Sequence, residues 1–189
     1  SKIISETDNG IYDAFNKGLK LASGDIIGFL NSDDIFYNNN CLQMIANAFD
    51  EETDAVFGNL DYLDYKGKVT RKWRSKSFVN GAFKKGWMPA HPTFYCKKEV
   101  YDKLGNYDSN FKIAGDFELM LRFLEKHRIK TKFINNTIIY MTSGGVSNSG
   151  FKSKIEILLE EFKAFQQNDI QLSKLNYIVN KALKFKEYF

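Results

Sequence analysis

Residues 25–34 read Asp25-Ile26-Ile27-Gly28-Phe29-Leu30-Asn31-Ser32-Asp33-Asp34 and decide the fold class. The apolar run in the first half is typical of a short strand that is covered on both faces in an α/β sheet. The run stops at a cluster of turn-forming residues that contains two adjacent carboxylates. Ligands of open α/β sheets bind beyond the carboxyl ends of the strands, so we expect Asp33 and Asp34 to lie at a ligand site.

The acidic pair allows two interpretations. Two neighbouring carboxylates repel each other unless a proton or a cation lies between them, and a hard divalent cation shared with ligand phosphates is a common solution. In a regular strand the two side chains would point to opposite faces, but a strand end that turns would let both reach one ion. The alternative is structural: Asp34 caps the following turn and Asp33 is solvated.

The chain's size and composition are those of one globular domain with a core of its own. It has 189 residues, of which 43% are hydrophobic and 26% are charged. Cys41 and Cys96 are too few for a disulfide framework, so we expect free thiols and a cytoplasmic location. No apolar run is long enough for a transmembrane helix. The chain begins at Ser1 without a signal peptide, in the middle of a polar stretch, which we interpret as the start of a fragment.

Charge is distributed unevenly along the chain. Residues 1–65 carry 3 basic and 12 acidic residues, whereas residues 66–103 carry 11 basic and 2 acidic residues. This distribution allows two interpretations. An acidic segment next to a basic one would suit a metal site beside bound phosphates, or the basic segment is simply a pair of strands with solvated lysines. The basic run at 66–76 contains no known docking motif, so we expect no nucleic-acid partner.

Strand and helix patterns alternate along the chain, which predicts an α/β layered sheet. Strands are expected at residues 26–30, 54–63, 69–74, 91–96, 131–134 and 137–141, and helices at residues 10–22, 42–49, 97–104 and 116–127. The candidate chemical residues end near residue 150. Two amphipathic helices follow, which gives an expected domain at 1–150 and a helical extension at 151–189 packed on it.

Asp116 and His91 are the other candidate functional residues. Asp116 begins a predicted helix, where a carboxylate can simply be the N-cap, or can act as a general base that a rigid helix points into a crevice. Gly115 would let a substrate approach the backbone. His91 precedes a predicted strand, where a structural hydrogen bond is the more common role. His127 ends the same helix as Asp116 and is expected to interact with its dipole.

Several enzyme classes are excluded by absent motifs. The sequence has no phosphate loop, no dinucleotide-binding glycine fingerprint, no nucleophile elbow and no zinc spacing of Cys and His. A nucleotidyl- or phosphoryl-transferring enzyme would also use paired acids and basic phosphate ligands, but the missing phosphate loop counts against it.

Taken together, the motifs resemble those of the inverting glycosyltransferase family 2, which has the GT-A fold. The resemblance covers about residues 5–148. It is carried by Ser5-Glu6-Thr7-Asp8-Asn9-Gly10-Ile11-Tyr12-Asp13-Ala14-Phe15-Asn16-Lys17-Gly18, by residues 24–34, by His91-Pro92-Thr93-Phe94, by Gly105-Asn106-Tyr107-Asp108 with Gly115-Asp116-Phe117-Glu118-Leu119, and by Ser143-Gly144-Gly145-Val146-Ser147.

The resemblance implies a role for each candidate residue. Asp34, with Asp33, would bind Mn²⁺ or Mg²⁺ at the diphosphate of a nucleotide-sugar donor, and Asp33 would also hold the ribose or the sugar. Asp116 would be the catalytic base. The remaining donor-site residues implied by the resemblance are Asn16, Lys17, Asn31, His91 and Gly115. Asn31 stands where the family usually has the first acid of its Asp-x-Asp pattern.

The implied reaction is metal-dependent transfer of a sugar, with inversion, to a glycan or lipid-linked acceptor in polysaccharide biosynthesis. The family's first strand and helix would lie upstream of Ser1, so we expect an incomplete base pocket and little turnover by this chain. The alternative is a non-catalytic binding or scaffold fragment of the same fold. The basic run at 66–76 and the lysine-rich last helix are further expected to make a peripheral contact with the inner face of the membrane. The sequence leaves the oligomeric state undetermined.

Overall fold

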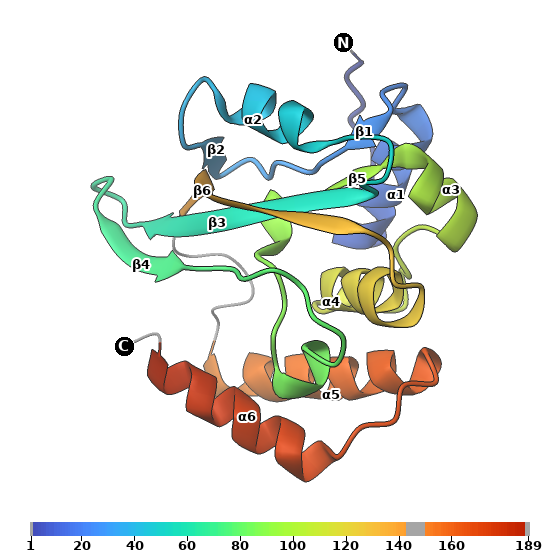
Figure 1. Ribbon diagram of the computed structural model, residues 1–189, viewed down its shortest axis with the longest axis vertical. Helices are drawn as coiled ribbons and strands as arrows, with labels where there is room; N and C mark the ends of the chain where they lie inside the picture. Colours follow the sequence, from blue (N-terminus) through green and yellow to red (C-terminus); the bar gives the residue numbers. More distant parts are fainter. Residues whose placement is uncertain (1, 143–149, 188–189) are drawn as a thin grey trace.

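A computed structural model of the protein describes residues 2–142 and 150–187. The described residues form a six-stranded mixed sheet with helices on both sides (Figure 1). The strand order is β1-β5-β3-β6-β2, β4 pairs with β3, and only the β3–β6 pair is parallel. The strands are β1 (Ile26–Ile27), β2 (Asp34–Phe36), β3 (Ala55–Leu63), β4 (Val69–Trp73), β5 (Tyr95–Lys97) and β6 (Thr131–Thr142).

The helices are distributed unequally over the two faces of the sheet. In Figure 1, α2 lies above the sheet, whereas α4, α5 and α6 lie below it. The helices are α1 (Ile11–Leu21), α2 (Cys41–Ala48), α3 (Lys98–Leu104), α4 (Gly115–Met120), α5 (Gly150–Gln167) and α6 (Lys174–Glu187). Among the described residues, no helix is long and apolar enough to cross a bilayer.

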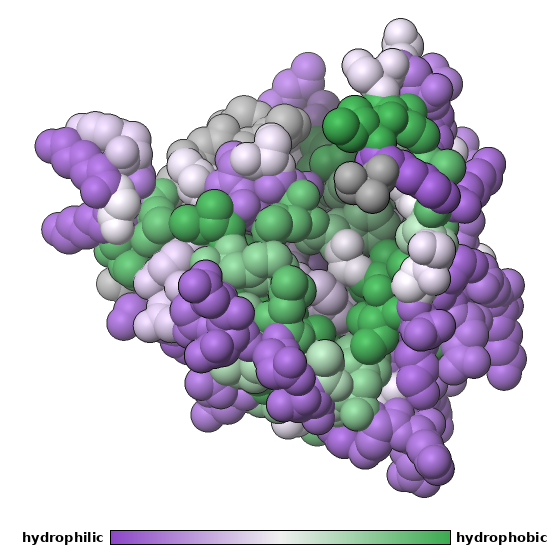
Figure 2. All heavy atoms as spheres, turned by 90° about the horizontal axis from the view of Figure 1, so that it is seen from above, coloured by the Kyte–Doolittle hydropathy of each residue, from purple (hydrophilic) through white to green (hydrophobic). Residues whose placement is uncertain are grey.

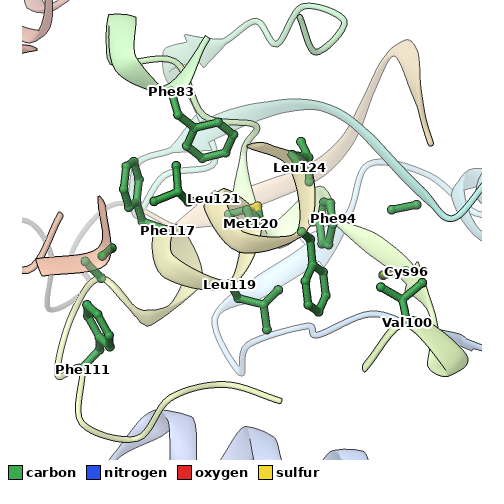
Figure 3. Close-up of a cluster of buried hydrophobic side chains, with 14 of the residues drawn as sticks. Phe83, Phe94, Cys96, Val100, Phe111, Phe117, Leu119, Met120, Leu121 and Leu124 are labelled. Atoms are coloured by element: carbon green, nitrogen blue, oxygen red, sulfur yellow. The ribbon is translucent and has the colours of Figure 1, made fainter. Parts of the chain in front are cut away.

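The apolar side chains of β3 divide between two cores. Leu60 and Val56 are fully buried in the smaller core against Cys41 and Ile45 of α2. Phe57 is fully buried in the larger core on the other face, which is rich in aromatic rings. Figure 3 shows part of this larger core around α4. A central strand with apolar side chains on both faces is what a layered α/β fold requires.

The strand at 26–30 is shorter and more exposed than we predicted. Regular pairing ends after Ile27, because the ring of Tyr95 packs directly on Gly28, where a Cβ atom would lie 2.1 Å from it. Leu30 is 46% exposed, so the expected coverage on both faces is wrong. Asp34 does not end this strand but begins β2, which pairs with β6 at the far end of the strand order.

The face of the molecule seen from above in Figure 1 carries apolar surface. Figure 2 shows this surface in green, gathered in the middle of the face and bordered by polar residues. Exposed large apolar side chains of the N-terminal third of the chain include Ile4, Ile11, Leu30, Ile35 and Leu42. A contiguous exposed apolar surface is unusual for an isolated monomer, which makes the face shown in Figure 2 a candidate contact surface.

Three other predicted elements differ from the structure. The strands expected at 131–134 and 137–141 form one strand, β6, whose register against β3 shifts beside Gly58 because the side chain of Ile138 occupies the space next to that glycine. The stretch at 91–96 starts as a 3-10 turn, η2 (His91–Thr93), before β5 begins. The helix expected at 116–127 is α4 followed by a π-helical segment, η3 (Leu121–Lys126).

Residues 78–88 are partly buried. They contain a 3-10 turn, η1 (Phe83–Lys85), whose Phe83 is fully buried. The carboxylate of Glu125 accepts hydrogen bonds from the backbone N–H groups of Gly81 and Phe83, at 2.9 and 3.0 Å, and so fixes this turn over the core. The motif at residues 143–147 lies outside the described residues.

The two C-terminal helices share the larger core with the rest of the chain. Phe165 of α5 packs against Phe117 of α4, with ring centroids 5.7 Å apart. Tyr177 of α6 is fully buried, and its hydroxyl donates to the carboxylate of Glu161 over 3.0 Å. Lys181 completes this cluster with an ion pair of 2.5 Å to Glu161. The division of the chain at residue 150 stays a prediction, and the apolar packing continues across it.

Candidate active site

A small hollow lies where α4 meets the turn before β5 and the segment after β1. Its cavity volume is about 20 Å³, close to the space of one water molecule. The polar side chains that line it are Asn31, His91 and Asp116, and aromatic rings that include Phe29 and Tyr107 form its remaining wall. Three of the predicted site residues, from segments far apart in the sequence, therefore share one hollow.

Asp116 occupies the second position of α4 and does not cap the helix. The N-cap is Ala114, and no side-chain hydrogen bond caps this end. One carboxylate oxygen, Oδ2, lies 3.1 Å from Nδ1 of His91, and Oδ1 lies 3.3 Å from the Tyr12 hydroxyl. The structural alternative of N-capping is therefore wrong, because the carboxylate points into the hollow instead.

The Tyr12 hydroxyl serves two acceptors with one proton. Its oxygen lies 2.6 Å from the carbonyl oxygen of Ile113 and 3.3 Å from Asp116 Oδ1, so the proton is shared unequally in favour of Ile113. Burial, and then the negative charge of Asp116, raise the pKa of Tyr12, which keeps the hydroxyl a donor. Asp116 Oδ1 is consequently only weakly satisfied and retains lone pairs directed at the hollow.

His91 is held by its own turn. Thr93 Oγ1 donates to the carbonyl oxygen of Ala90 over 2.7 Å and accepts from the N–H of Gly58 in β3 over 3.1 Å. The His91 side chain itself is 33% exposed. The turn thus fixes the backbone of His91 against the central strand while its imidazole reaches Asp116.

Asp34 is buried and incompletely hydrogen-bonded. Its exposed fraction is 3%, and its Oδ2 accepts one hydrogen bond of 3.0 Å from the Asn31 side chain. The other oxygen, Oδ1, is buried without a partner among the described residues. Burial raises the pKa of Asp34, and the charge of Asp33 raises it further, whereas the Asn31 hydrogen bond and nearby His91 lower it. The structural alternative for Asp34 as a turn cap is not what these contacts show.

Asp33 differs from Asp34 in its surroundings. It is exposed, and its contact with the neighbouring strand is made by the backbone, because its carbonyl oxygen accepts from Thr142 Oγ1 over 2.9 Å. Its carboxylate is therefore available to a ligand. The two acids are adjacent in sequence, but one is buried and the other is solvated.

The acidic pair fits a hard cation. An unpaired buried carboxylate oxygen is the kind of ligand that Mg²⁺ and Mn²⁺ take, and the exposed Asp33 could supply a second oxygen. Within residues 2–142 and 150–187, no group of three or more His, Cys, Asp or Glu side chains is arranged as a metal site. A cation here would therefore need further oxygen ligands from a bound phosphate and from water.

The structure does not bring Lys17 to the hollow. Its ammonium forms ion pairs with three carboxylates, those of Glu6 at 3.0 Å, Asp8 at 2.8 Å and Asp13 at 3.1 Å. The hydrogen bonds to Asp8 and Glu6 raise the pKa of Lys17. Lys17 lines a second hollow of about 740 Å³ between the N-terminal segment and α1. An ammonium already surrounded by three carboxylates is a poor phosphate ligand in this arrangement.

Asn16 and Gly115 have structural partners. The Asn16 side chain makes two hydrogen bonds with the backbone of Tyr107, of 2.9 and 3.0 Å, and so supports a residue that lines the hollow. A Cβ atom on Gly115 would lie 2.6 Å from the ring of Tyr12. The Tyr12 ring therefore occupies the space where a side chain at position 115 would lie, and the expected approach of a substrate to the Gly115 backbone stays a prediction.

Sequence reasoning missed three residues that shape this site: Tyr12, Tyr107 and Glu160. Tyr12 and Tyr107 stack with ring centroids 5.6 Å apart and form the wall behind Asp116. Glu160 reaches the loop before α4 from the distant helix α5. Tyr12 lies inside a quoted motif and could have been found there, whereas nothing in the sequence near Glu160 indicates its partner.

The motifs and the geometry agree with a comparison to known families. The family model described as "Glycosyl transferase family 2" matches residues 1–128. The chain belongs to glycosyl transferase family 2. The match contains every residue that lines the hollow and ends before the two C-terminal helices begin.

Relatives in the family are glycosyltransferases from bacteria. A "PGL/p-HBAD biosynthesis glycosyltransferase" of Mycobacterium bovis is 25% identical over 148 residues, which cover 76% of this chain and 56% of that protein. An "Uncharacterized glycosyltransferase" of Mycobacterium tuberculosis is 31% identical over 137 residues, covering 62% of this chain and 45% of that protein. The family 2 chain thus spans about half the length of these relatives.

Solved structures share the fold. S. aureus TarS 1–349 in complex with UDP-GlcNAc aligns with a TM-score of 0.57 and 15% identity, over 92% of this chain and 51% of that chain. TarS 1–349 without that ligand aligns with a TM-score of 0.54 and 16% identity, over 92% and 50% of the two chains. The mixed sheet flanked by helices is therefore the GT-A fold predicted from the motifs.

Proposed function

We propose that this family 2 chain forms the catalytic half of a glycosyltransferase that moves a sugar, with inversion, from a nucleoside-diphosphate sugar to a glycan or lipid-linked acceptor. The observation that supports it is the convergence of Asn31, His91 and Asp116 on one hollow beside the buried Asp34. Asp34 and Asp116 are 82 positions apart in the sequence, and His91 influences both carboxylates. Paired acids next to a separate, oriented carboxylate suit a donor site beside a base.

Asp116 has the geometry of a general base. In the proposed step, the acceptor hydroxyl gives its proton to Asp116, its oxygen attacks the anomeric carbon, and the bond to the nucleoside diphosphate breaks on the opposite side. His91 and Tyr12 orient the carboxylate, which limits the rotation that an isolated aspartate would have. Holding the base and the two substrates in line can supply much of the rate enhancement.

Asp34 and Asp33 would hold the divalent cation, Mn²⁺ or Mg²⁺, and when bound it would neutralise charge on the diphosphate. The unpaired oxygen of Asp34 supports this assignment. A nucleotide-sugar donor is also supported by TarS 1–349, which has been solved with UDP-GlcNAc and with UDP. The sugar and base used by this chain are open to experiment.

Binding of nucleoside diphosphates tests the proposal directly. A panel of nucleoside diphosphates is titrated with and without Mn²⁺, following thermal stability and heat of binding. Asp34→Asn is expected to abolish the Mn²⁺-dependent part of binding, and Asp116→Asn is expected to leave it unchanged while stopping sugar transfer. Asp25→Asn, an exposed acid in the same segment, is the matched control. Binding that is equal in all three variants would contradict the assignment of Asp34.

The non-catalytic alternative makes a different prediction in the same experiment. A scaffold with a merely structural acidic pair would show no nucleoside-diphosphate binding with any metal. The same result in a longer form of the protein would favour the scaffold.

We further propose that α6 touches a membrane surface. Leu175, Val179 and Leu183 follow one another at helical spacing and are 72%, 48% and 57% exposed. With the lysines of the last helix, such a stripe suits an anionic lipid surface that carries a lipid-linked acceptor. Co-sedimentation with anionic vesicles at raised salt tests this, and Leu175→Ser with Leu183→Ser should weaken it. Equal sedimentation of the variant and the wild type would contradict the contact.

A further inference from the structure

Glu160 of α5 makes an unusual set of contacts with the loop before α4. Its carboxylate accepts hydrogen bonds from three consecutive backbone N–H groups: Lys112 at 2.8 Å, Ile113 at 3.0 Å and Ala114 at 2.8 Å. Hydrogen bonds to a charged acceptor are stronger than neutral ones, so three on one carboxylate form a firm attachment. One side chain of the C-terminal helix pair therefore fixes three residues of this loop.

The loop fixed by Glu160 leads directly to Asp116. Ala114 is the N-cap of α4, and Asp116 is the second residue of that helix. No side chain of α4 itself caps this end. The first N–H groups of a helix lack partners within the helix, so the loop needs support from elsewhere in the fold. Glu160 provides that support from another layer of the molecule.

The Ile113 residue is held from both sides. Its N–H group donates to Glu160 over 3.0 Å, and its carbonyl oxygen accepts from the Tyr12 hydroxyl over 2.6 Å. Tyr12 also contacts Asp116 Oδ1. A displacement of this residue would move both the backbone that carries Asp116 and the hydroxyl that orients its carboxylate.

The helix that carries Glu160 is itself well anchored. Lys163 donates to the carbonyl oxygen of Asn110 over 3.1 Å, and its ammonium lies 4.3 Å from the ring centroid of Phe111. Directly after the last residue of α5, Asn168 donates to the Glu118 carboxylate over 3.1 Å. These contacts lie on both sides of the loop in sequence, so Glu160 has a fixed place from which to hold it.

We propose that Glu160 is a positioning residue for Asp116, and that α5 is thereby a working part of the active site. It acts through the backbone of residues 112–114 and touches neither reacting group. The consequence for catalysis rests on the proposed function, since it takes Asp116 as the base. A purely structural role would instead lower stability alone and leave turnover by the folded enzyme unchanged.

Glu160→Gln in the full-length protein tests this inference, with Glu156→Gln, an exposed acid one turn earlier on α5, as the control. Glutamine keeps the shape but removes the charge and one acceptor oxygen, and turns an amide group toward the N–H donors. Amide hydrogen exchange at Ile113 and Ala114 should become about tenfold faster, in line with the loss of one or two charge-assisted hydrogen bonds. The kcat should fall about tenfold through misplacement of the base, with the KM for donor unchanged. The control should change none of these quantities.

Two results would overturn the inference. Unchanged exchange at residues 113 and 114 would show that Glu160 does not hold the loop, and faster exchange with unchanged kcat would show that the loop does not position Asp116. If Glu160→Gln does not fold, Glu160→Asp, which keeps the charge on a shorter side chain, takes its place with the same expectations. A wild-type protein that binds no donor would contradict the proposed function, and the exchange measurement would still decide whether Glu160 holds the loop.

Discussion

The candidate site has two acidic sides, named for their proposed roles: the base wall around Asp116, which lines the hollow, and the donor wall around Asp33 and Asp34, next to Asn31. Asp116 is contacted by two side chains, and the loop before it is fixed by three hydrogen bonds to Glu160. Asp34 has one hydrogen bond and an unpaired buried oxygen, and Asp33 beside it is exposed. The difference teaches that Asp116 is held in place by the protein alone, whereas the side of Asp34 keeps an unpaired oxygen that a ligand could complete.

This difference between the two walls affects the stability of the folded state. A buried polar atom without a partner costs about 1–3 kcal/mol, and a fold keeps such an atom only where something else requires it. On the base wall the polar groups have partners, so changes that crowd or remove those partners should lower stability, whereas the isosteric Asp116→Asn keeps its contact with Tyr12. On the donor wall, the buried charge of Asp34 destabilises the fold when no cation is bound. Removing this charge should therefore raise stability.

The largest expected effect comes from the base itself. Asp116→Asn should lower sugar transfer by about a hundredfold to ten-thousandfold, which is the contribution typical of a general base. The asparagine can keep the contact with Tyr12, so the fold and the donor affinity should stay the same. Single-turnover transfer and donor titration measure the two quantities separately. Transfer at the wild-type rate would remove Asp116 from the reaction.

The second largest effect should come from crowding the Tyr12 ring, which packs next to Gly115. Gly115→Ala places a methyl group 2.6 Å from the Tyr12 ring, and crowding of this kind costs about 1–3 kcal/mol. The free energy of unfolding from urea titration measures it. Gly18→Ala in α1 is the control, because nothing lies within 4 Å of its new methyl group, and alanine should stabilise that helix by about 0.5–1 kcal/mol. Equal effects at both glycines would contradict the packing argument.

On the donor wall, a substitution should raise the free energy of unfolding instead of lowering it. At neutral pH and without metal, Asp34→Asn should raise the free energy of unfolding by about 1 kcal/mol, because it removes a charge that burial disfavours. The pKa of Asp34 is raised in the folded state, so the gain should be complete above that raised pKa and disappear as pH falls toward 3.8. Urea titrations across this pH range measure the gain, and a variant less stable than the wild type at pH 7 would contradict it.

The smallest effect concerns His127, which lies outside both walls. Desolvation, followed by the charges of Lys126 and Arg122, lowers the pKa of His127, so the expected favourable interaction with the helix dipole does not dominate. The unfolded chain then binds more protons, and stability should decline as pH falls through and below 6.5. His127→Gln should flatten this decline slightly, because the side chain is exposed. An unchanged slope between pH 5 and 7 in thermal melts would contradict the shift.

The order of the elements and the fold could be predicted because they depend on local patterns. Helix α1 lies within one residue of its predicted limits, since its apolar spacing is strong. The strand at 26–30 could not be delimited, because its end is set by the ring of Tyr95 on Gly28, a contact made across the sheet. The two predicted strands left out Asn135 and Asn136, whereas in the structure both residues lie within β6 and Asn59 of β3 donates to the Asn135 side chain.

The candidate site likewise contains residues that could be predicted from the sequence and residues that could not. The acids Asp34 and Asp116 carry motif signals, and the structure places them near a common hollow with His91 between them. The roles of these residues stay predictions. The motif does not show that three carboxylates surround the ammonium of Lys17, and its expected place near the nucleotide stays a prediction. Glu160 was missed because a side chain that binds backbone N–H groups needs no particular residue type in its partner.

The attachment of Ile113 between Tyr12 and Glu160 has a consequence for the order of folding. The residue is held by groups from near both ends of the chain, at positions 12 and 160. Contacts of such long sequence separation form late, because much of the chain must already be ordered before they can close. During synthesis, Asp116 would leave the ribosome long before Glu160 does. We therefore expect Asp116 to acquire its final position among the last events of folding, after the sheet has assembled.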